Sequence, residues 1–251
     1  MQIMIKKNIC TALLLACCTL TLAAKDYKAS LFGVKSDGVT LNTGSIQKAV
    51  DLISSKGGGR LVFYVGRYLT GSIQLRSNVT IHLEEGAILV AAPSVYEYDT
   101  VDGVKALIVA EACDSIGITG KGVIEGQGPA VLDHIRMQVQ KGYLQDAPAQ
   151  IRPALIALKG CSAVTIEGIN LFDACGDVQS YRNCSGLTVR GINVKSVATD
   201  GSRGLALSGC RNVRLNDSFF DTSGREISSV APSGDIRTAG CINKAGKKLH
   251  F

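Results

Sequence analysis

Four segments of the chain fall into register when they are aligned on a cysteine, and this repeat constrains the fold more than any other feature. The segments begin at Cys113, Cys161, Cys184 and Cys210. Each has branched apolar residues three and five positions after its cysteine and another apolar residue at the tenth position. A spacing of two is typical of a strand with one buried face. Each segment is therefore predicted to form a strand, a corner and a second strand.

The length of this repeat predicts a β-solenoid. The last three of the cysteines lie 23 and 26 residues apart, and a unit of that size cannot bury its apolar face unless it stacks on a neighbour. We expect one all-β domain over residues 25–251, because 251 residues suit a single core. Apolar residues from Ile46 to Ile53 have helical spacing, which predicts a short helix that caps the first coil, with Thr43 or Ser45 as its N-cap.

Residues 128–152 interrupt the repeat. We expect a projecting loop or short helix there, which is the kind of insertion that forms a binding wall on repeat proteins.

Six cysteines follow Cys18, an even number that ordinarily suggests a disulfide framework in an exported protein. Cysteines at one position of successive coils would instead stack as small apolar side chains. We therefore expect a reduced cysteine column. Cys175 and Cys241 fall outside this column, and the sequence assigns them no partner.

The first 24 residues have the pattern of a secretory signal, with Lys6 and Lys7, an apolar run and small residues up to Ala24. This predicts cleavage after Ala24 and a periplasmic or secreted protein. The segment ending at Cys17 also resembles a bacterial lipobox, which leaves a lipid anchor at Cys17 open. No later stretch is long and apolar enough to cross a bilayer. The net charge of +6 is modest and spread along the chain, so we expect no nucleic-acid partner.

Several motifs in ordered succession resemble the bacterial polygalacturonases and rhamnogalacturonases. They are FGVKSDGVTLNTGSIQKAVD from Phe32, TGSIQLRSNVTIHLEEGAIL from Thr70, ITGKGVIEGQG from Ile118 and GCRNVRL from Gly209. The resemblance covers residues 32–220. It implies a right-handed parallel β-helix that hydrolyses α-1,4 links between galacturonic acid units with inversion, without a metal or cofactor. It further implies an acidic plant polysaccharide, pectin or galacturonan, as partner, and we expect a monomer.

An inverting glycosidase needs one carboxyl group that protonates the leaving oxygen and a second that activates water. In the family these come from an Asn-Xaa-Asp-Gly motif and an Asp-Asp pair about one coil later, with Gly-His-Gly and Arg-Xaa-Lys further on. An ungapped alignment on Gly204 puts Arg203 in place of the first acid, and Gly224 and Arg225 in place of the pair. A shift of three residues would instead place Asp200 in the first motif. Neither later motif appears before Phe251.

The candidate catalytic acids are Asp200 and the out-of-register Glu226. An Asp before Gly is also a common turn residue, and Glu226 could form an exposed ion pair with Arg225. The candidate substrate-binding residues are Arg203, Arg225 and Asp177. Arginines in the groove would favour a galacturonate carboxylate, whereas a surface arginine without a partner is the alternative.

The apolar alternation fades after Ile227, so we expect the last coils to be incomplete after about residue 227. Three functions remain open, namely a pectin glycosidase of the polygalacturonase type, a relative that binds acidic glycans without cleaving them, and a truncated inactive product. A calcium-dependent pectate lyase is disfavoured because the sequence has no clustered acids for the ion. A trimeric β-solenoid adhesin would have the same fold.

Overall fold

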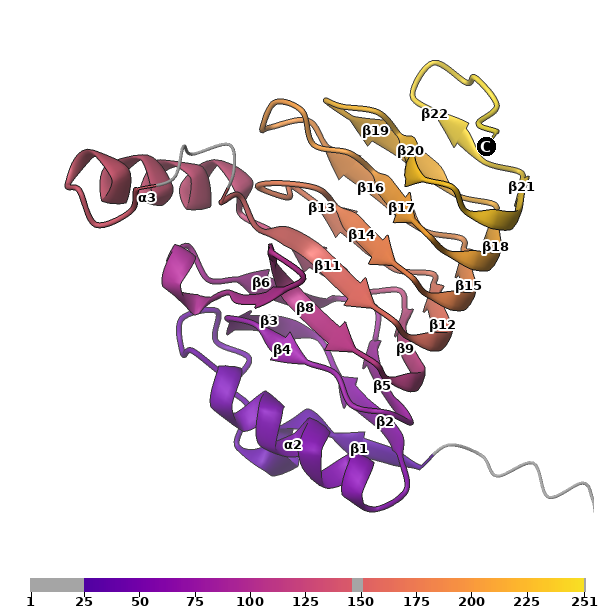
Figure 1. The fold of residues 1–251 in the computed structure, drawn as a ribbon. Helices are drawn as coiled ribbons and strands as arrows, with labels where there is room; N and C mark the ends of the chain where they lie inside the picture. Colours follow the sequence, from indigo (N-terminus) through magenta and orange to yellow (C-terminus); the bar gives the residue numbers. More distant parts are fainter. Residues whose placement is uncertain (1–24, 146–150, 251) are drawn as a thin grey trace, which may run out of the picture.

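The computed structural model describes residues 25–145 and 151–250, and these form a right-handed parallel β-helix (Figure 1). The fold predicted from the repeat is confirmed. The predicted signal sequence, the cleavage site at Ala24 and the alternative lipid site at Cys17 lie outside the described residues. No helix in the described ranges is long and apolar enough to span a membrane.

Three parallel sheets run the length of the β-helix. Sheet A contains β1 (Asp26–Lys28), β2 (Gly59–Phe63), β5 (Val79–Leu83), β9 (Asp114–Gly120), β12 (Ser162–Glu167), β15 (Ser185–Arg190), β18 (Arg211–Asn216) and β21 (Gly234–Ala239). Sheet B contains β3 (Gly66–Thr70), β6 (Ala87–Ala91), β10 (Val123–Glu125), β13 (Asn170–Phe172), β16 (Asn193–Ser196), β19 (Phe219–Thr222) and β22 (Ile242–Asn243).

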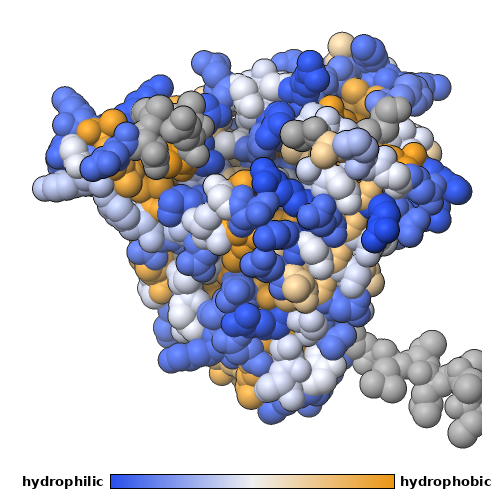
Figure 2. All heavy atoms as spheres, in the orientation of Figure 1, coloured by the Kyte–Doolittle hydropathy of each residue, from blue (hydrophilic) through white to orange (hydrophobic). Residues whose placement is uncertain are grey.

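Sheet C lies nearest the viewer in Figure 1. It contains β4 (Ile73–Gln74), β8 (Val104–Glu111), β11 (Ala154–Lys159), β14 (Gln179–Arg182), β17 (Leu205–Ser208) and β20 (Ile227–Ala231), and β7 (Asp99–Val101) pairs antiparallel with β8. One face of each sheet packs into a single core of stacked apolar side chains. The outer face of sheet C is mainly hydrophilic in Figure 2, with scattered apolar side chains.

The cysteines of the repeat form the expected column at the corner between sheets C and A. Cys113, Cys161, Cys184 and Cys210 each donate a weak hydrogen bond to the carbonyl two residues earlier, at 3.4–3.6 Å. All six cysteines after Cys18 are free thiols, which confirms the reduced column. Cys241 lies at a different corner, between β21 and β22.

Helix α2 (Thr43–Ser55) caps the first coil as predicted, with Ile46, Ala49, Val50 and Ile53 buried. The N-cap prediction was wrong, because the residue before the helix is Asn42 and the Thr43 hydroxyl instead accepts a hydrogen bond from the Gly71 amide.

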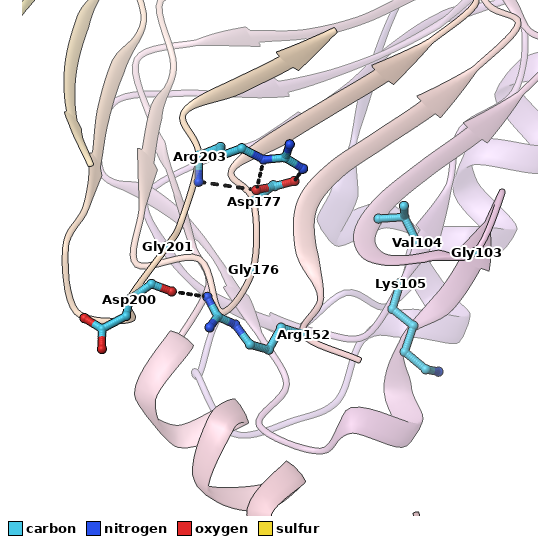
Figure 3. A pocket seen from close by; sticks show the side chains of 9 residues that line it. All are labelled: Gly103, Val104, Lys105, Arg152, Gly176, Asp177, Asp200, Gly201 and Arg203. Atoms are coloured by element: carbon cyan, nitrogen blue, oxygen red, sulfur yellow. Dashed lines mark hydrogen bonds and ion pairs between the residues drawn. The ribbon is translucent and has the colours of Figure 1, made fainter. Parts of the chain in front are cut away.

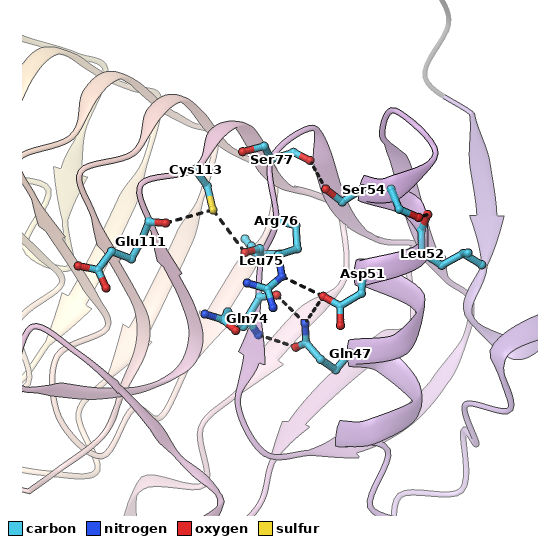
Figure 4. A network of polar contacts seen from close by, with 11 residues as sticks. Gln47, Asp51, Leu52, Ser54, Gln74, Leu75, Arg76, Ser77, Glu111 and Cys113 are labelled. Atoms are coloured by element: carbon cyan, nitrogen blue, oxygen red, sulfur yellow. Dashed lines mark hydrogen bonds and ion pairs between the residues drawn. The ribbon is translucent and has the colours of Figure 1, made fainter.

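Polar side chains fasten α2 to β4 at the end of sheet C (Figure 4). Gln47 exchanges two hydrogen bonds with the backbone of Gln74, and Asp51 pairs with Arg76 at 2.9 Å. The helix thus covers a strand edge that could otherwise pair with another chain.

Helix α3 (Gly128–Gln140) projects from one side of the β-helix (Figure 1), where the break in the repeat at residues 128–152 predicted a projecting loop or short helix. Its residue His134 accepts a hydrogen bond from the Val95 amide of η2 (Val95–Glu97). A second short helix, η1 (Ala29–Phe32), follows β1.

The β-helix continues for one more coil beyond Ile227, which corrects the expectation of incomplete coils. Strands β20, β21 and β22 pair in parallel with β17, β18 and β19. The segment after β22 then turns back, and the Leu249 amide donates to the Cys241 carbonyl. Leu249 packs against the end of the core, so the described chain covers part of its last coil.

Candidate functional site

Three of the predicted site residues occupy one position in successive coils. Asp177, Arg203 and Arg225 come directly before the strand region of sheet C in their coils. The Val178 amide donates to the Arg203 carbonyl at 2.8 Å, and the Gly204 amide donates to the Arg225 carbonyl at 3.0 Å. These backbone hydrogen bonds stack Asp177 on Arg203 and Arg203 on Arg225 in successive coils. The two arginines occupy the positions at which the ungapped alignment expected acids.

Asp177 and Arg203 form a bidentate ion pair between neighbouring coils. The Arg203 guanidinium donates from Nε to Oδ1 of Asp177 at 2.9 Å and from Nη2 to Oδ2 at 2.5 Å. The hydrogen bond that Arg203 donates to Asp177 raises the pKa of Arg203, which keeps the guanidinium charged. Paired, forked hydrogen bonds of this kind fix both side chains in one orientation.

A pocket of about 370 Å³ opens beside this ion pair (Figure 3). It is lined by Gly103, Val104, Lys105, Arg152, Gly176, Asp177, Asp200, Gly201 and Arg203. Arg152 is held in place by two carbonyls, those of Cys175 at 2.7 Å and Asp200 at 2.5 Å. Three basic residues and two acidic residues therefore line one opening, although the Lys105 ammonium donates to the Tyr98 carbonyl at 2.9 Å.

Asp200 is exposed, and it contributes its backbone carbonyl to Arg152. Its carboxylate points away from the Asp177–Arg203 pair in Figure 3. The two acids of the pocket thus differ, because Asp177 is held by an arginine whereas Asp200 faces solvent.

Arg225 and Glu226 do not line this pocket. Arg225 is exposed, and Glu226 accepts a hydrogen bond from the Asn243 amide group at 2.8 Å. Among the ion pairs of the described residues, none joins Glu226 to Arg225. The structure therefore brings together Asp177, Asp200 and Arg203 and leaves the other two predicted residues one coil away.

A small hollow of about 30 Å³ adjoins the pocket on the outer face of sheet C, and Arg203 lines both. Ser180 and Ala206 face each other on adjacent strands at the floor of this hollow, and Arg182 also lines it. Nearer the N-terminus, Val109 and Ala157 are buried in an apolar cluster with Val101 of β7. We call the pocket and this hollow the sheet C groove.

A second charged row flanks this floor. Lys159 and Arg182 are adjacent on β11 and β14, and both pair with Asp102 of the β7–β8 turn, at 3.3 and 2.5 Å. The hydrogen bond from Arg182, followed by that from Lys159, lowers the pKa of Asp102. Lys159 also pairs with Glu111 at 3.0 Å. Sequence reasoning missed this row, because its members are separated by up to 80 residues.

The groove offers no evident metal site. In residues 25–145 and 151–250, no group of three or more His, Cys, Asp or Glu side chains could hold an ion. The groups available for chemistry there are arginines, lysines, hydroxyls and two carboxylates.

Comparison with known proteins identifies the class. Residues 61–247 match the family model of the glycosyl hydrolases family 28, and the chain belongs to this family. A presumed glycosyl hydrolase from Parabacteroides merdae has 46% sequence identity and a TM-score of 0.86, over 90% of this chain and 99% of that one. The resemblance to polygalacturonases noted from the motifs is thereby confirmed.

Other relatives are more distant and longer. An exo-poly-alpha-D-galacturonosidase from Dickeya chrysanthemi is 24% identical over 86% of this chain but only 44% of its own length. The polygalacturonase of Erwinia carotovora has 18% identity and a TM-score of 0.71, over 88% of this chain and 63% of that one. The chain thus spans less than half the length of the curated relative, and the likeness to the Erwinia structure concerns the fold alone.

Proposed function

We propose that this protein binds galacturonan-type acidic polysaccharide in the sheet C groove and does not hydrolyse it. The observation that carries this proposal is the bidentate ion pair between Arg203 and Asp177. It engages one of the two carboxylates that line the pocket, where an inverting mechanism needs two acids, and it fixes a guanidinium beside the opening. Export, as predicted from residues 1–24, would bring the protein to such a polymer.

The charge of the groove suits a polyuronate. Lys105, Arg152 and Arg203 outnumber the two carboxylates that line the pocket. Arginine binds carboxylates through planar, forked hydrogen bonds. Arg182 and Arg203 both line the hollow beside the pocket, so a second guanidinium lies next to the one at the opening.

Binding in such a groove is expected to depend strongly on salt, since exposed charges are screened over about 10 Å at 0.1 M ionic strength. Titration calorimetry with tetragalacturonate at low and high salt tests this. Arg203→Gln should weaken binding, whereas Arg211→Gln removes the same charge from an exposed position on sheet A and should not. An absence of binding at low salt, or equal losses in both variants, would contradict the proposal.

Hydrolysis of galacturonan is the second candidate, and one observation favours it. Asp177 and Asp200 line the same pocket of a family 28 chain. An inverting enzyme places its two carboxyl groups on opposite sides of the bond, about 6.5–9.5 Å apart, with one of them protonated. In this case Asp200 would have to work with an acid bound to arginine, which is why we rank this function second.

A further inference from the structure

The small hollow of the sheet C groove is built on four positions of two adjacent strands. Ser180 and Arg182 lie two residues apart on β14, and Ala206 and Ser208 face them on β17. Residues two apart on a strand point to the same face of the sheet, so these four side chains stand together on the outer face of sheet C. Arg203 borders the hollow on the side of the pocket, since it lines both.

Ser180 is a buried polar residue of this hollow whose hydroxyl has no protein partner. The residue is only 8% exposed, and the tip of the β7–β8 hairpin, with Val101 and Asp102, lies on its other side. Within residues 25–145 and 151–250, no protein group forms a hydrogen bond with the Ser180 hydroxyl. Buried polar groups in native proteins ordinarily have a partner, so this hydroxyl is available to a ligand that enters the hollow.

Two guanidinium groups border the same hollow, and each is held by a carboxylate from outside its lining. Asp177 accepts hydrogen bonds from two of the five N–H groups of Arg203 (Figure 3), and Asp102 accepts one from Arg182 at 2.5 Å. These ion pairs orient both guanidiniums and leave further N–H groups for a ligand. Seven of the described residues line the hollow, and none of these seven is acidic.

The size of the hollow limits the groups that can enter it. Its volume of about 30 Å³ is close to the share of one water molecule in the liquid. A carboxylate group fits such a space, whereas a sugar ring has to stay outside, over the pocket. A methyl ester adds a carbon atom and removes the negative charge, so it would lose both the fit and the charge-assisted hydrogen bonds from the arginines.

We propose that this hollow is a carboxylate subsite, in which Ser180, Ser208, Arg182 and Arg203 bind the free acid group of one galacturonate unit. The inference rests on the proposed function of the sheet C groove and adds to it a residue that selects an unesterified unit. Ser180 is that residue. The two arginines attract any anion near the groove, whereas the buried hydroxyl acts only on a group that is seated in the hollow.

The test compares tetragalacturonate with its methyl ester by titration calorimetry at low salt. The unsubstituted protein should bind the free acid at least about tenfold more tightly than the ester, which is the effect of one charge-assisted hydrogen bond. Ser180→Ala removes a donor to the seated carboxylate and should weaken the binding of the free acid by about three- to tenfold.

Ser185→Ala is the matched control, because Ser185 is a partly buried serine of β15 on sheet A, and it should leave the affinity unchanged. Amide chemical shifts of the 15N-labelled protein locate the ligand. Those of Ser180, Ala206 and Ser208 should move with the free acid and not with the ester.

The subsite is overturned if Ser180→Ala binds the free acid as tightly as the unsubstituted protein does, if Ser185→Ala weakens binding equally, or if the ester moves the same amides. Binding of the free acid by the unsubstituted protein would in those cases still support the proposed function. An absence of such binding at low salt would overturn both.

Discussion

Arg203 reaches across one coil of the β-helix and binds both carboxylate oxygens of Asp177, at 2.9 and 2.5 Å. The Arg203 side chain is 37% exposed and that of Asp177 is 18% exposed, so the pair is accessible to a ligand from the arginine side. This pair determines which charged group the pocket presents to a ligand. Asp177 orients the guanidinium of Arg203, and that guanidinium lies at the opening of the pocket.

Asp177→Asn should strengthen the binding of tetragalacturonate at low salt. The amide cannot neutralise Arg203, so the guanidinium gains net charge toward the ligand, by an amount comparable with a partly exposed ion pair, about 0.5–1 kcal/mol or two- to fivefold in Kd. Calorimetry measures the change. Asp235→Asn removes the same charge from an exposed pair with Arg237 on sheet A and should have little effect. Weaker binding in Asp177→Asn would mean that Asp177 contacts the sugar itself.

Tyr181→Phe should destabilise the fold although it removes only one oxygen. Tyr181 is fully buried in the core, and its hydroxyl donates to the side-chain oxygen of Gln179 at 2.8 Å. Gln179 in turn donates to the Gly204 carbonyl at 3.3 Å. Removing the hydroxyl leaves a buried acceptor unpaired, which costs about 1–3 kcal/mol.

Urea unfolding measures this loss, with Tyr143→Phe as the control because Tyr143 is 70% exposed. Equal stabilities of the two variants would show that water satisfies the Gln179 oxygen.

The cysteines of residues 25–251 should react slowly with a thiol reagent at pH 7 while the protein is folded. Five of the six are buried, and Cys113 is partly exposed. Burial raises the pKa of Cys113, and it raises the pKa of Cys175 to about 11, so these two thiols form little thiolate. Hydrogen bonds with Cys184 instead lower the pKa of Cys161 and of Cys210, so burial alone keeps the reagent from these two. After unfolding without reductant, all six should titrate. A count of four or fewer would reveal a disulfide and contradict the reduced column.

Asp173→Asn should stabilise the protein at neutral pH and have a smaller effect in acid. Burial, with a lesser contribution from Glu125, raises the pKa of Asp173 above its usual value of 3.8, and Lys195 opposes this. A raised pKa favours the protonated form in the folded state, so its stabilising contribution is complete below pH 3.8 and is lost as the pH rises through the folded value.

Thermal unfolding at pH 3 and pH 7 measures this dependence. Asn also tolerates the left-handed backbone of Asp173, whose φ is 50°, but that benefit does not vary with pH. An increase in Tm of equal size at both pH values would therefore argue against the electrostatic origin.

The coils with an apolar repeat could be predicted from the sequence, whereas the last coil could not. The alternation around Val213 and Leu215 of β18 indicates a strand directly. Strand β21 is largely exposed, and only Ile236 and Thr238 are partly buried. It forms because its backbone pairs in parallel with the edge of β18. Backbone pairing of this kind requires no alternation of apolar and polar side chains, so the sequence does not reveal it.

The site was predictable in part for a similar reason. Arg203 and Arg225 could be placed in one ladder because the repeat fixes their coil position. Arg152 and Lys105 could not, since they come from an insertion and from a hairpin that follow no repeat. Their approach to Asp200 and Asp177 depends on how those segments fold over sheet C, as the bond from Arg152 to the Asp200 carbonyl illustrates.

The release of new reducing ends from polygalacturonate by purified residues 25–251, with a chelator present, tests the central claim most directly. We predict that a folded sample binds the polymer and releases no reducing ends above the level of Asp200→Asn. Release that is lost in Asp200→Asn but kept in Asp235→Asn would contradict the claim and show that the pocket hydrolyses its ligand.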